Sequence, residues 1–266
     1  MKIAVMGASG RMGKEVLAAT ERRSDMELAA AFERPEAGVE GMPVSALGAA
    51  SSAVKVTSDL DSALAACDCA VDFTRPEASM MFLDAALKAG KNLVIGTTGF
   101  DEGQLARIQS AAKSIRIALA PNFSVGVNVV FGLLAQAERA LGADYDVEIV
   151  EAHHRRKVDA PSGTALRMGE ILAKEMGGSL KELGVMGRNG NVGPRKKGTI
   201  GISAVRGGDI AGDHLVIFAG DGERVEIGHR ASGRSAFADG ALRAAAWLKD
   251  QKPGLYDMQD VLGLWV

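Results

Sequence analysis

Residues 3–13 read IAVMGASGRMG, so a short apolar run leads directly into three glycines spaced three residues apart. The apolar run predicts a buried strand, and residues 12–21 have the periodicity of an amphipathic helix. Glycines between a strand and a helix permit a tight turn and let a pyrophosphate approach the helix N-terminus closely. We therefore expect a dinucleotide-binding loop whose contacts come from Gly7, Ala8, Ser9, Gly10, Arg11 and Met12.

An acidic residue follows the next strand-like run, residues 27–32, at the spacing that such a loop requires. Glu33 lies twenty residues after Gly13, where a carboxylate can accept hydrogen bonds from an adenosine ribose. Arg34 comes next, and its guanidinium either holds the 2′-phosphate of NADP or is a solvated surface charge. Glu33 favours NADH and Arg34 favours NADPH, so the sequence leaves the preference open and predicts use of both.

The first half of the chain alternates apolar runs with amphipathic stretches. Strand-like runs occupy residues 3–6, 27–32, 54–56, 69–73, 93–95 and 115–120, and helical stretches include 12–21, 77–89 and 102–112. This alternation predicts an α/β fold, a Rossmann-type parallel sheet with helices on both faces. Ligands bind where such strands end. Two turns at strand ends are therefore candidate cofactor contacts, although either could be purely structural: Gly96, Thr97 and Thr98, and Ala120, Pro121, Asn122 and Phe123.

The pattern changes after Pro121. Helical stretches at about 127–141 and 164–176 alternate with strand-like runs at 144–152, 199–205, 214–219 and 225–229, and helical periodicity returns at 235–249. Consecutive strands joined by glycine-rich links predict a second, α+β domain with a mixed sheet. We expect a dinucleotide-binding domain of residues 1–124 and 234–266, and a domain of residues 125–233 for the substrate and for oligomerisation. Two crossings between domains predict a hinge that brings the cofactor to the second domain.

The segment 151–164, EAHHRRKVDAPSGT, carries the strongest chemical signal in the chain. His153, His154 and three fixed cations fall within five residues, at the end of a predicted strand. Like charges repel, so the cluster favours an anionic partner. The turn Ser162-Gly163-Thr164 opens a helix, and a helix N-terminus binds anions. The pattern predicts a carboxylate pocket beside a proton donor, with a solvated basic strand end as the alternative.

Composition narrows the class of protein. The chain has 266 residues, 47% hydrophobic and 24% charged, with a formal net charge of -2, which favours a globular protein with no nucleic-acid or membrane partner. We expect no signal peptide, no disulfide framework from the two cysteines, and a cytoplasmic location. We also expect no metal site, because adjacent histidines on a strand point to opposite faces and no further ligands lie at familiar spacing.

On these motifs the chain resembles, from end to end, the family of 4-hydroxy-tetrahydrodipicolinate reductases, also called dihydrodipicolinate reductases. The run from Glu151 to Ala165 is the most specific of them. The resemblance implies a two-domain enzyme of lysine and diaminopimelate biosynthesis. Such an enzyme reduces the cyclic imine derived from 4-hydroxy-tetrahydrodipicolinate to tetrahydrodipicolinate with NADH or NADPH. It also implies a homotetramer formed through the second domain. The sequence leaves open whether the 4-hydroxy substrate loses water on the enzyme.

The resemblance also implies roles for individual residues. His153 matches the proton donor/acceptor and Lys157 the second catalytic residue, and the matching substrate-binding positions are His154, Gly163 and Thr164. The glycine loop, Glu33, Arg34 and the two strand-end turns match cofactor positions. The short-chain reductases with a Tyr-x-x-x-Lys pair are excluded, because the residues four places after the two tyrosines are Ile149 and Asp260. A non-catalytic nucleotide sensor would have no use for the basic histidine cluster.

Overall fold

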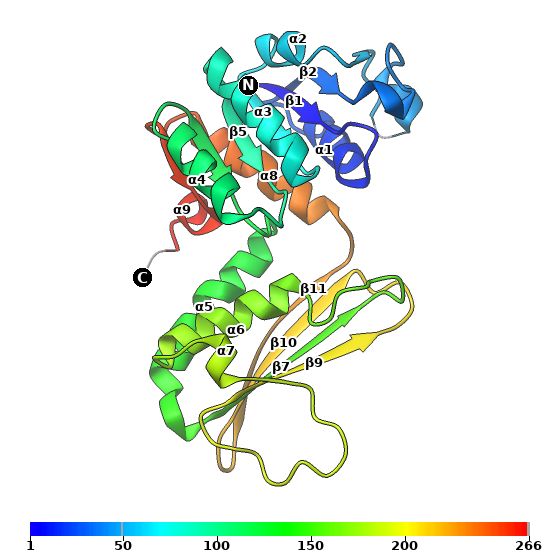
Figure 1. The fold of residues 1–266 in the computed structure, drawn as a ribbon. Coiled ribbons are helices and arrows are strands. Elements are labelled where there is room, and N and C mark those ends of the chain that lie inside the picture. The colour runs from blue at the N-terminus through cyan, green and yellow to red at the C-terminus, as the bar shows by residue number, and fades with distance from the viewer. Residues whose placement is uncertain (49, 265–266) are drawn as a thin grey trace. The chain divides into compact units, whose positions relative to one another are not determined.

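A computed structural model describes residues 1–48 and 50–264. The chain forms two compact units (Figure 1): Met1–Val125 with Arg234–Gly263, and Gly126–Gly233. Each unit has its own sheet and its own hydrophobic core. The predicted fold class, a Rossmann-type parallel sheet beside an α+β unit with a mixed sheet, is confirmed.

The first unit contains a seven-stranded sheet in the order β12-β6-β5-β4-β1-β2-β3, in which all neighbouring strands are parallel. Its strands are β1 (Lys2–Met6), β2 (Glu27–Phe32), β3 (Val56–Thr57), β4 (Cys69–Asp72), β5 (Asn92–Ile95), β6 (Arg116–Leu119) and β12 (Gly254–Tyr256). The strand order reverses at β1 and β4. In sheets of this kind a ligand binds at that point, outside the carboxyl ends of the strands.

Helices cover both faces of this sheet, as the period-2 alternation within β1 shows. Ile3 and Val5 face a core shared with α1 (Arg11–Glu21), α8 (Ser235–Leu248) and α9 (Met258–Leu262). Ala4 and Met6 face the opposite core, which includes residues of α2 (Leu60–Ala65), α3 (Pro76–Ala89) and α4 (Glu102–Ala111). Successive side chains of a strand point to opposite faces, so an apolar run without alternating polar residues needs two covering layers.

The second unit contains a five-stranded mixed sheet in the order β11-β10-β7-β9-β8. Its strands are β7 (Asp146–His153), β8 (Gly184–Met186), β9 (Ile200–Arg206), β10 (Gly212–Ala219) and β11 (Arg224–Ala231). β7 is antiparallel to β10 and parallel to β9. In Figure 1, α5 (Val125–Leu141), α6 (Gly163–Glu175) and α7 (Leu180–Leu183) lie on one side of the sheet, and their apolar residues share one core with the strands.

Several short elements lie outside the sequence-based expectations. They are α2, α7, α9, β8, β12 and three 3-10 helices, η1 (Pro35–Ala37), η2 (Val44–Leu47) and η3 (Gly142–Asp144). Segments of three to six residues show no reliable hydrophobic period, because one helical turn or one strand pair is too short to repeat. The helix at 235–249 is α8, and it contacts α1, β5 and β6 of the first unit. Within the described ranges, no helix is long and apolar enough to cross a bilayer.

Candidate active site

The glycine loop between β1 and α1 has a backbone that other residues would not adopt there. Gly7 has a positive φ of 70°, and a Cβ on it would lie 2.6 Å from Cγ2 of Thr74. A Cβ on Gly13 would lie 2.1 Å from the carbonyl oxygen of Gly7, so α1 packs directly on the loop. Close packing at Gly7 and at Gly13 therefore fixes the two ends of the loop. Its middle, Ser9 to Met12, lies at the N-terminus of α1, where a pyrophosphate would bind.

Glu33 directly follows β2 and is bonded to the glycine loop. Its Oε2 accepts hydrogen bonds from the Ser9 amide at 3.0 Å and the Ser9 hydroxyl at 2.6 Å, and its Oε1 accepts one from the Arg34 amide at 3.1 Å. The carboxylate therefore holds the loop in shape besides being available to a ribose. The side chain of Arg34 is exposed next to it.

A cavity of about 990 Å³ lies over these elements. Its lining includes seven of the predicted cofactor residues: Gly7, Ser9, Gly10, Arg11, Met12, Glu33 and Arg34. Phe73, Thr74 and Arg75 after β4 also line it, where Thr74 and Arg75 are a third strand-end turn of the kind expected from the sequence. Ala8 is fully buried and does not line the cavity, so only its backbone could serve a ligand.

The predicted turns after β5 and β6 do not line the cavity. Buried contacts connect them to residues after β4 that do. Asp72, at the end of β4, is fully buried and accepts hydrogen bonds from the Thr74 amide (2.9 Å), the Thr74 hydroxyl (2.6 Å) and the Ser79 hydroxyl. Thr97 Oγ1 accepts a further bond from the Thr74 amide at 3.0 Å. Burial raises the pKa of Asp72 and outweighs these hydrogen bonds, which lower it.

Phe73 joins the remaining predicted residues. A Cβ on Gly96 would lie 2.0 Å from the Phe73 ring, so the ring packs on the Gly96 backbone. The rings of Phe73 and Phe123 meet edge to face at 5.8 Å. Ala120 and Phe123 are buried, Asn122 is half-buried, and Thr98 and Pro121 are exposed. The structure thus brings the ends of β4, β5 and β6 together, with backbone and a few polar side chains at the surface.

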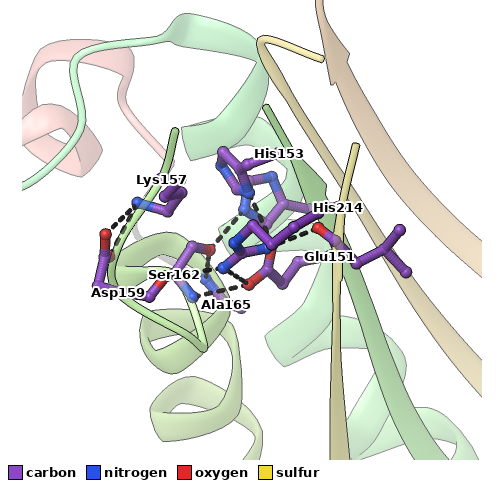
Figure 2. Close-up of polar contacts among 9 residues, drawn as sticks. Glu151, His153, Lys157, Asp159, Ser162, Ala165 and His214 are labelled. Atoms are coloured by element: carbon purple, nitrogen blue, oxygen red, sulfur yellow. Dashed lines mark hydrogen bonds and ion pairs between the residues drawn. The ribbon is translucent and has the colours of Figure 1, made fainter. Parts of the chain in front are cut away.

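The second group of predicted residues lies at the end of β7. His153 is the last residue of the strand, and its Nδ1 lies 2.6 Å from Oε2 of the buried Glu151 (Figure 2). Both terminal nitrogens of Arg206 bond the same carboxylate, at 2.8 and 2.7 Å. Burial alone would raise the pKa of Glu151, but the bonds from Arg206, His153 and the Ser162 amide outweigh it, so the pKa is lowered. His153 therefore has an anion at Nδ1, which leaves Nε2 for a ligand.

Ser162 joins this group to the N-terminus of α6. Its amide donates to Glu151 Oε1 at 3.0 Å, and its hydroxyl accepts from the Ala165 amide at 3.1 Å as the N-cap of α6. The same hydroxyl lies 2.9 Å from Nε2 of His214, which is buried against the His153 ring (Figure 2). Burial, with His153 as the second cause, lowers the pKa of His214 to about 4, so this ring is neutral near pH 7.

Lys157 is paired within its own loop. Its ammonium lies 2.9 and 2.8 Å from the two carboxylate oxygens of Asp159 (Figure 2). His154 and Thr164 are half-buried, and Gly163 is exposed as the first residue of α6. The basic cluster expected from the sequence thus contains two acidic residues, Glu151 and Asp159. Their carboxylates neutralise part of its positive charge.

Three residues of this site were not singled out from the sequence: Glu151, Arg206 and His214. Glu151 stands two places before His153, and that spacing on a strand puts both on one face, so a signal for it existed. The other two residues come from β9 and β10 and are brought here by strand pairing. No cluster of ligands that could hold a metal ion occurs in residues 1–48 and 50–264.

Comparison with known proteins bears on both units. A model of the dihydrodipicolinate reductase N-terminus matches residues 1–123, and a model of the C-terminus of the same family matches residues 126–262. The chain belongs to the dihydrodipicolinate reductase family. The resemblance inferred from the motifs is therefore confirmed.

Relatives of the family match over their whole length. A 4-hydroxy-tetrahydrodipicolinate reductase of Cupriavidus metallidurans is 50% identical, with 99% of this chain and 100% of the relative covered. That of Nitrosospira multiformis is 52% identical, with 99% and 98% covered. A solved dihydrodipicolinate reductase of Paenisporosarcina sp. TG-14, bound to dipicolinate, shares the fold at a TM-score of 0.77 and 24% identity, with 98% of both chains covered.

Proposed function

We propose that this chain, like the family to which it belongs, is an NAD(P)H-dependent oxidoreductase of lysine and diaminopimelate biosynthesis. It reduces the cyclic imine derived from 4-hydroxy-tetrahydrodipicolinate to tetrahydrodipicolinate. The observation that carries this proposal is the anion-held His153 beside the capped N-terminus of α6, in a chain about half identical to 4-hydroxy-tetrahydrodipicolinate reductases. NAD(P)H oxidation that depends on freshly prepared substrate tests it.

The first unit provides the features that a dinucleotide needs. Tight glycines, an open helix N-terminus and a cavity of about 990 Å³ fit a pyrophosphate and its ribose. Glu33 would accept hydrogen bonds from the adenosine ribose, and Arg34 would pair with a 2′-phosphate. When bound, the reduced nicotinamide supplies the hydride. Proposed cofactor contacts are Gly7 to Met12, Glu33, Arg34, Gly96 to Thr98 and Ala120 to Phe123, with Ala8, Ala120 and Phe123 acting through their backbone.

The second unit provides two kinds of anion site for a dicarboxylate. Lys157 would bind one carboxylate and share its ammonium with Asp159. The amides of Gly163 and Thr164, at the first turn of α6, would bind a carboxylate with help from the helix dipole. His154, half-buried beside them in the sequence motif, would add a further polar contact.

His153 is the proposed proton donor/acceptor. Reduction of a conjugated imine needs a proton as well as a hydride, and an imidazole is well matched to that transfer near neutral pH. Because Glu151 occupies Nδ1, Nε2 is the nitrogen that exchanges the proton. Lys157 supplies a fixed positive charge close to the carboxylate of the reacting ring.

We further propose that the enzyme is a homotetramer formed through the sheet of the second unit. The face opposite the helices carries Val150, Val205, Leu215 and Ile217, which share that face by register and alternation. Val205 is 49% exposed. These apolar side chains, on a face that also carries Glu148, favour a second copy as their cover. Light scattering tests this: Ile217→Asp should give smaller species, and a monomeric wild type would contradict it.

A cytoplasmic location is proposed on the state of the cysteines. Cys67 and Cys69 are buried free thiols, and burial raises the pKa of Cys67 to about 11. Protonated, unpaired thiols are typical of a reducing compartment. Fractionation of cells that produce the protein would show whether it partitions with cytoplasmic markers.

A further inference from the structure

Arg206, the last residue of β9, makes contacts with two separate parts of the site. Its Nη1 and Nη2 bond the two oxygens of Glu151 at 2.8 and 2.7 Å. Its Nη2 also donates to the carbonyl oxygen of Asp159 at 2.7 Å, in the loop that carries Lys157. One guanidinium therefore contacts both the strand of His153 and the loop of Lys157.

Glu151 completes the arrangement from the other side. It is fully buried, and besides Arg206 it contacts Nδ1 of His153 and the amide of Ser162. Four donors thus converge on one carboxylate, which fills the hydrogen-bonding capacity of its two oxygens. The bidentate fork of an arginine fixes direction as well as distance. The ion pair consequently ties together the catalytic histidine, the lysine loop and the N-cap of α6.

The energetics of this pair favour a role in orientation. Buried ion pairs give little net stability compared with apolar side chains of the same size, because both charges lose their hydration. Arg206 in addition keeps its Nε buried, without a hydrogen-bond partner among the residues that the structure describes. What the pair supplies in return is a fixed geometry between the end of β7, the loop of Lys157 and the N-cap of α6.

We propose that the Glu151–Arg206 ion pair is the positioning pair of the site: Glu151 keeps the His153 imidazole protonated at Nδ1 and its Nε2 directed at substrate, and Arg206 anchors the Lys157 loop through the Asp159 carbonyl. This inference rests on the proposed function for the roles of His153 and Lys157. Neither Glu151 nor Arg206 needs to touch the substrate.

The test uses the full-length enzyme with three substitutions. Glu151→Gln keeps the shape and removes the charge, Arg206→Lys keeps the charge and removes the fork, and the double variant combines them. We expect Glu151→Gln to lower kcat by about 10²-fold with a smaller change in KM, because it acts through the proton donor. Arg206→Lys should also raise KM, since the Lys157 loop loses its anchor. The double variant should be as active as the less active of the two single variants, because residues that act as one unit lose their effect together.

Imidazole nitrogen NMR provides a readout that a purely structural role would not move. In the wild type, the neutral ring of His153 should be a single Nδ1–H tautomer. In Glu151→Gln a mixture of tautomers should appear, since an amide can either donate or accept. Glu175→Gln is the matched control: it removes another glutamate–arginine pair, with Arg139, at the far end of α6. That variant should leave both kcat and the His153 signals unchanged.

Thermal unfolding and circular dichroism accompany each variant, and Glu151→Asp, which keeps the charge but shortens its reach, replaces Glu151→Gln if the latter does not fold. A Glu151 variant with kcat within about threefold of wild type overturns the proposal. A Glu151 variant that loses activity while His153 remains a single tautomer also overturns it, because Glu151 would then have a structural role alone. Failure of the wild type to turn over substrate refutes the proposed function instead, whereas the tautomer comparison still tests the Glu151–His153 link.

Discussion

Oε2 of Glu151 lies 2.6 Å from Nδ1 of His153, on the same face of β7 and at its carboxyl end. A carboxylate at Nδ1 fixes which nitrogen of the ring meets the ligand. The ring is 11% exposed in its side chain, so access to it is restricted to its outer edge. Because of this contact, His153 is a candidate proton donor whose Nε2 is the nitrogen that meets the ligand.

Replacing His153 should slow the chemical step. His153→Ala is expected to lower kcat by about 10²- to 10⁴-fold, the range for loss of a general acid or base. His154→Ala should mainly raise KM, because that residue is assigned to substrate binding. Steady-state kinetics on both variants checks this. The opposite pattern would exchange the two roles.

Replacing Lys157 should remove charge stabilisation without harming the fold. Lys157→Ala is expected to lower kcat/KM on the order of 10²-fold or more. An ion pair with a half-exposed partner such as Asp159 contributes only about 0–1 kcal/mol to stability, so the melting temperature should barely change. Binding of NADH to the free enzyme should be unaffected. Near-normal turnover in this variant would remove Lys157 from the mechanism.

Cofactor choice should respond separately to Arg34 and Glu33. Arg34→Ala should raise KM for NADPH and leave NADH nearly unchanged, because a charge-assisted bond is worth about 1.5–3 kcal/mol. Glu33→Gln removes the charge but keeps one acceptor oxygen for both Ser9 bonds, so it should favour NADPH without loosening the glycine loop. Glu33→Ala should weaken both cofactors.

For the wild type we expect use of both cofactors within about 100-fold in kcat/KM, since the two opposed contributions are similar in size. Kinetics with each cofactor on wild type and variants decides this. An Arg34→Ala enzyme indifferent to NADPH would show that the 2′-phosphate binds elsewhere.

His214 should make the fold sensitive to acid. Its pKa is lowered to about 4 from 6.5, chiefly by burial, so the unfolded chain takes up a proton below about pH 6.5 and the folded chain does not until about pH 4. The stability that the neutral ring contributes is thus complete above pH 6.5 and is lost as the pH falls towards 4. The loss amounts to about 3 kcal/mol at most.

Urea unfolding from pH 7 to pH 4 measures this effect. His214→Gln keeps a hydrogen-bonding group near Ser162 but cannot titrate, so its stability should fall less steeply over this interval than that of the wild type. Parallel curves would show that His214 is protonated equally in both states.

Whether the sequence alone predicts a site residue depends on how far apart along the chain the interacting residues lie. The glycine loop, Glu33 and the segment from His153 to Thr164 are continuous stretches, so local pattern identified them. Arg206 and His214 lie opposite His153 and Glu151 only through the parallel register of β9 and the antiparallel register of β10. Register in a mixed sheet depends on tertiary packing and cannot be derived from one strand's sequence.

The fold shows the same limit. Apolar runs that alternate with amphipathic helices predicted the parallel sheet, because strands buried on both faces read as continuous apolar runs. β12 of three residues joins that sheet beside β6 after the final long helix, and only its pairing with β6 identifies it. The pairing of Lys157 with Asp159 also required three dimensions, although the two residues are close in sequence.

The most direct test of the account is the absorbance of NADH and NADPH with the wild-type enzyme and 4-hydroxy-tetrahydrodipicolinate prepared immediately before use. We expect oxidation of both cofactors only when substrate and enzyme are present together, with a rate that falls by about 10²-fold or more in His153→Ala. No substrate-dependent oxidation with either cofactor, from a folded enzyme that binds them, would contradict it.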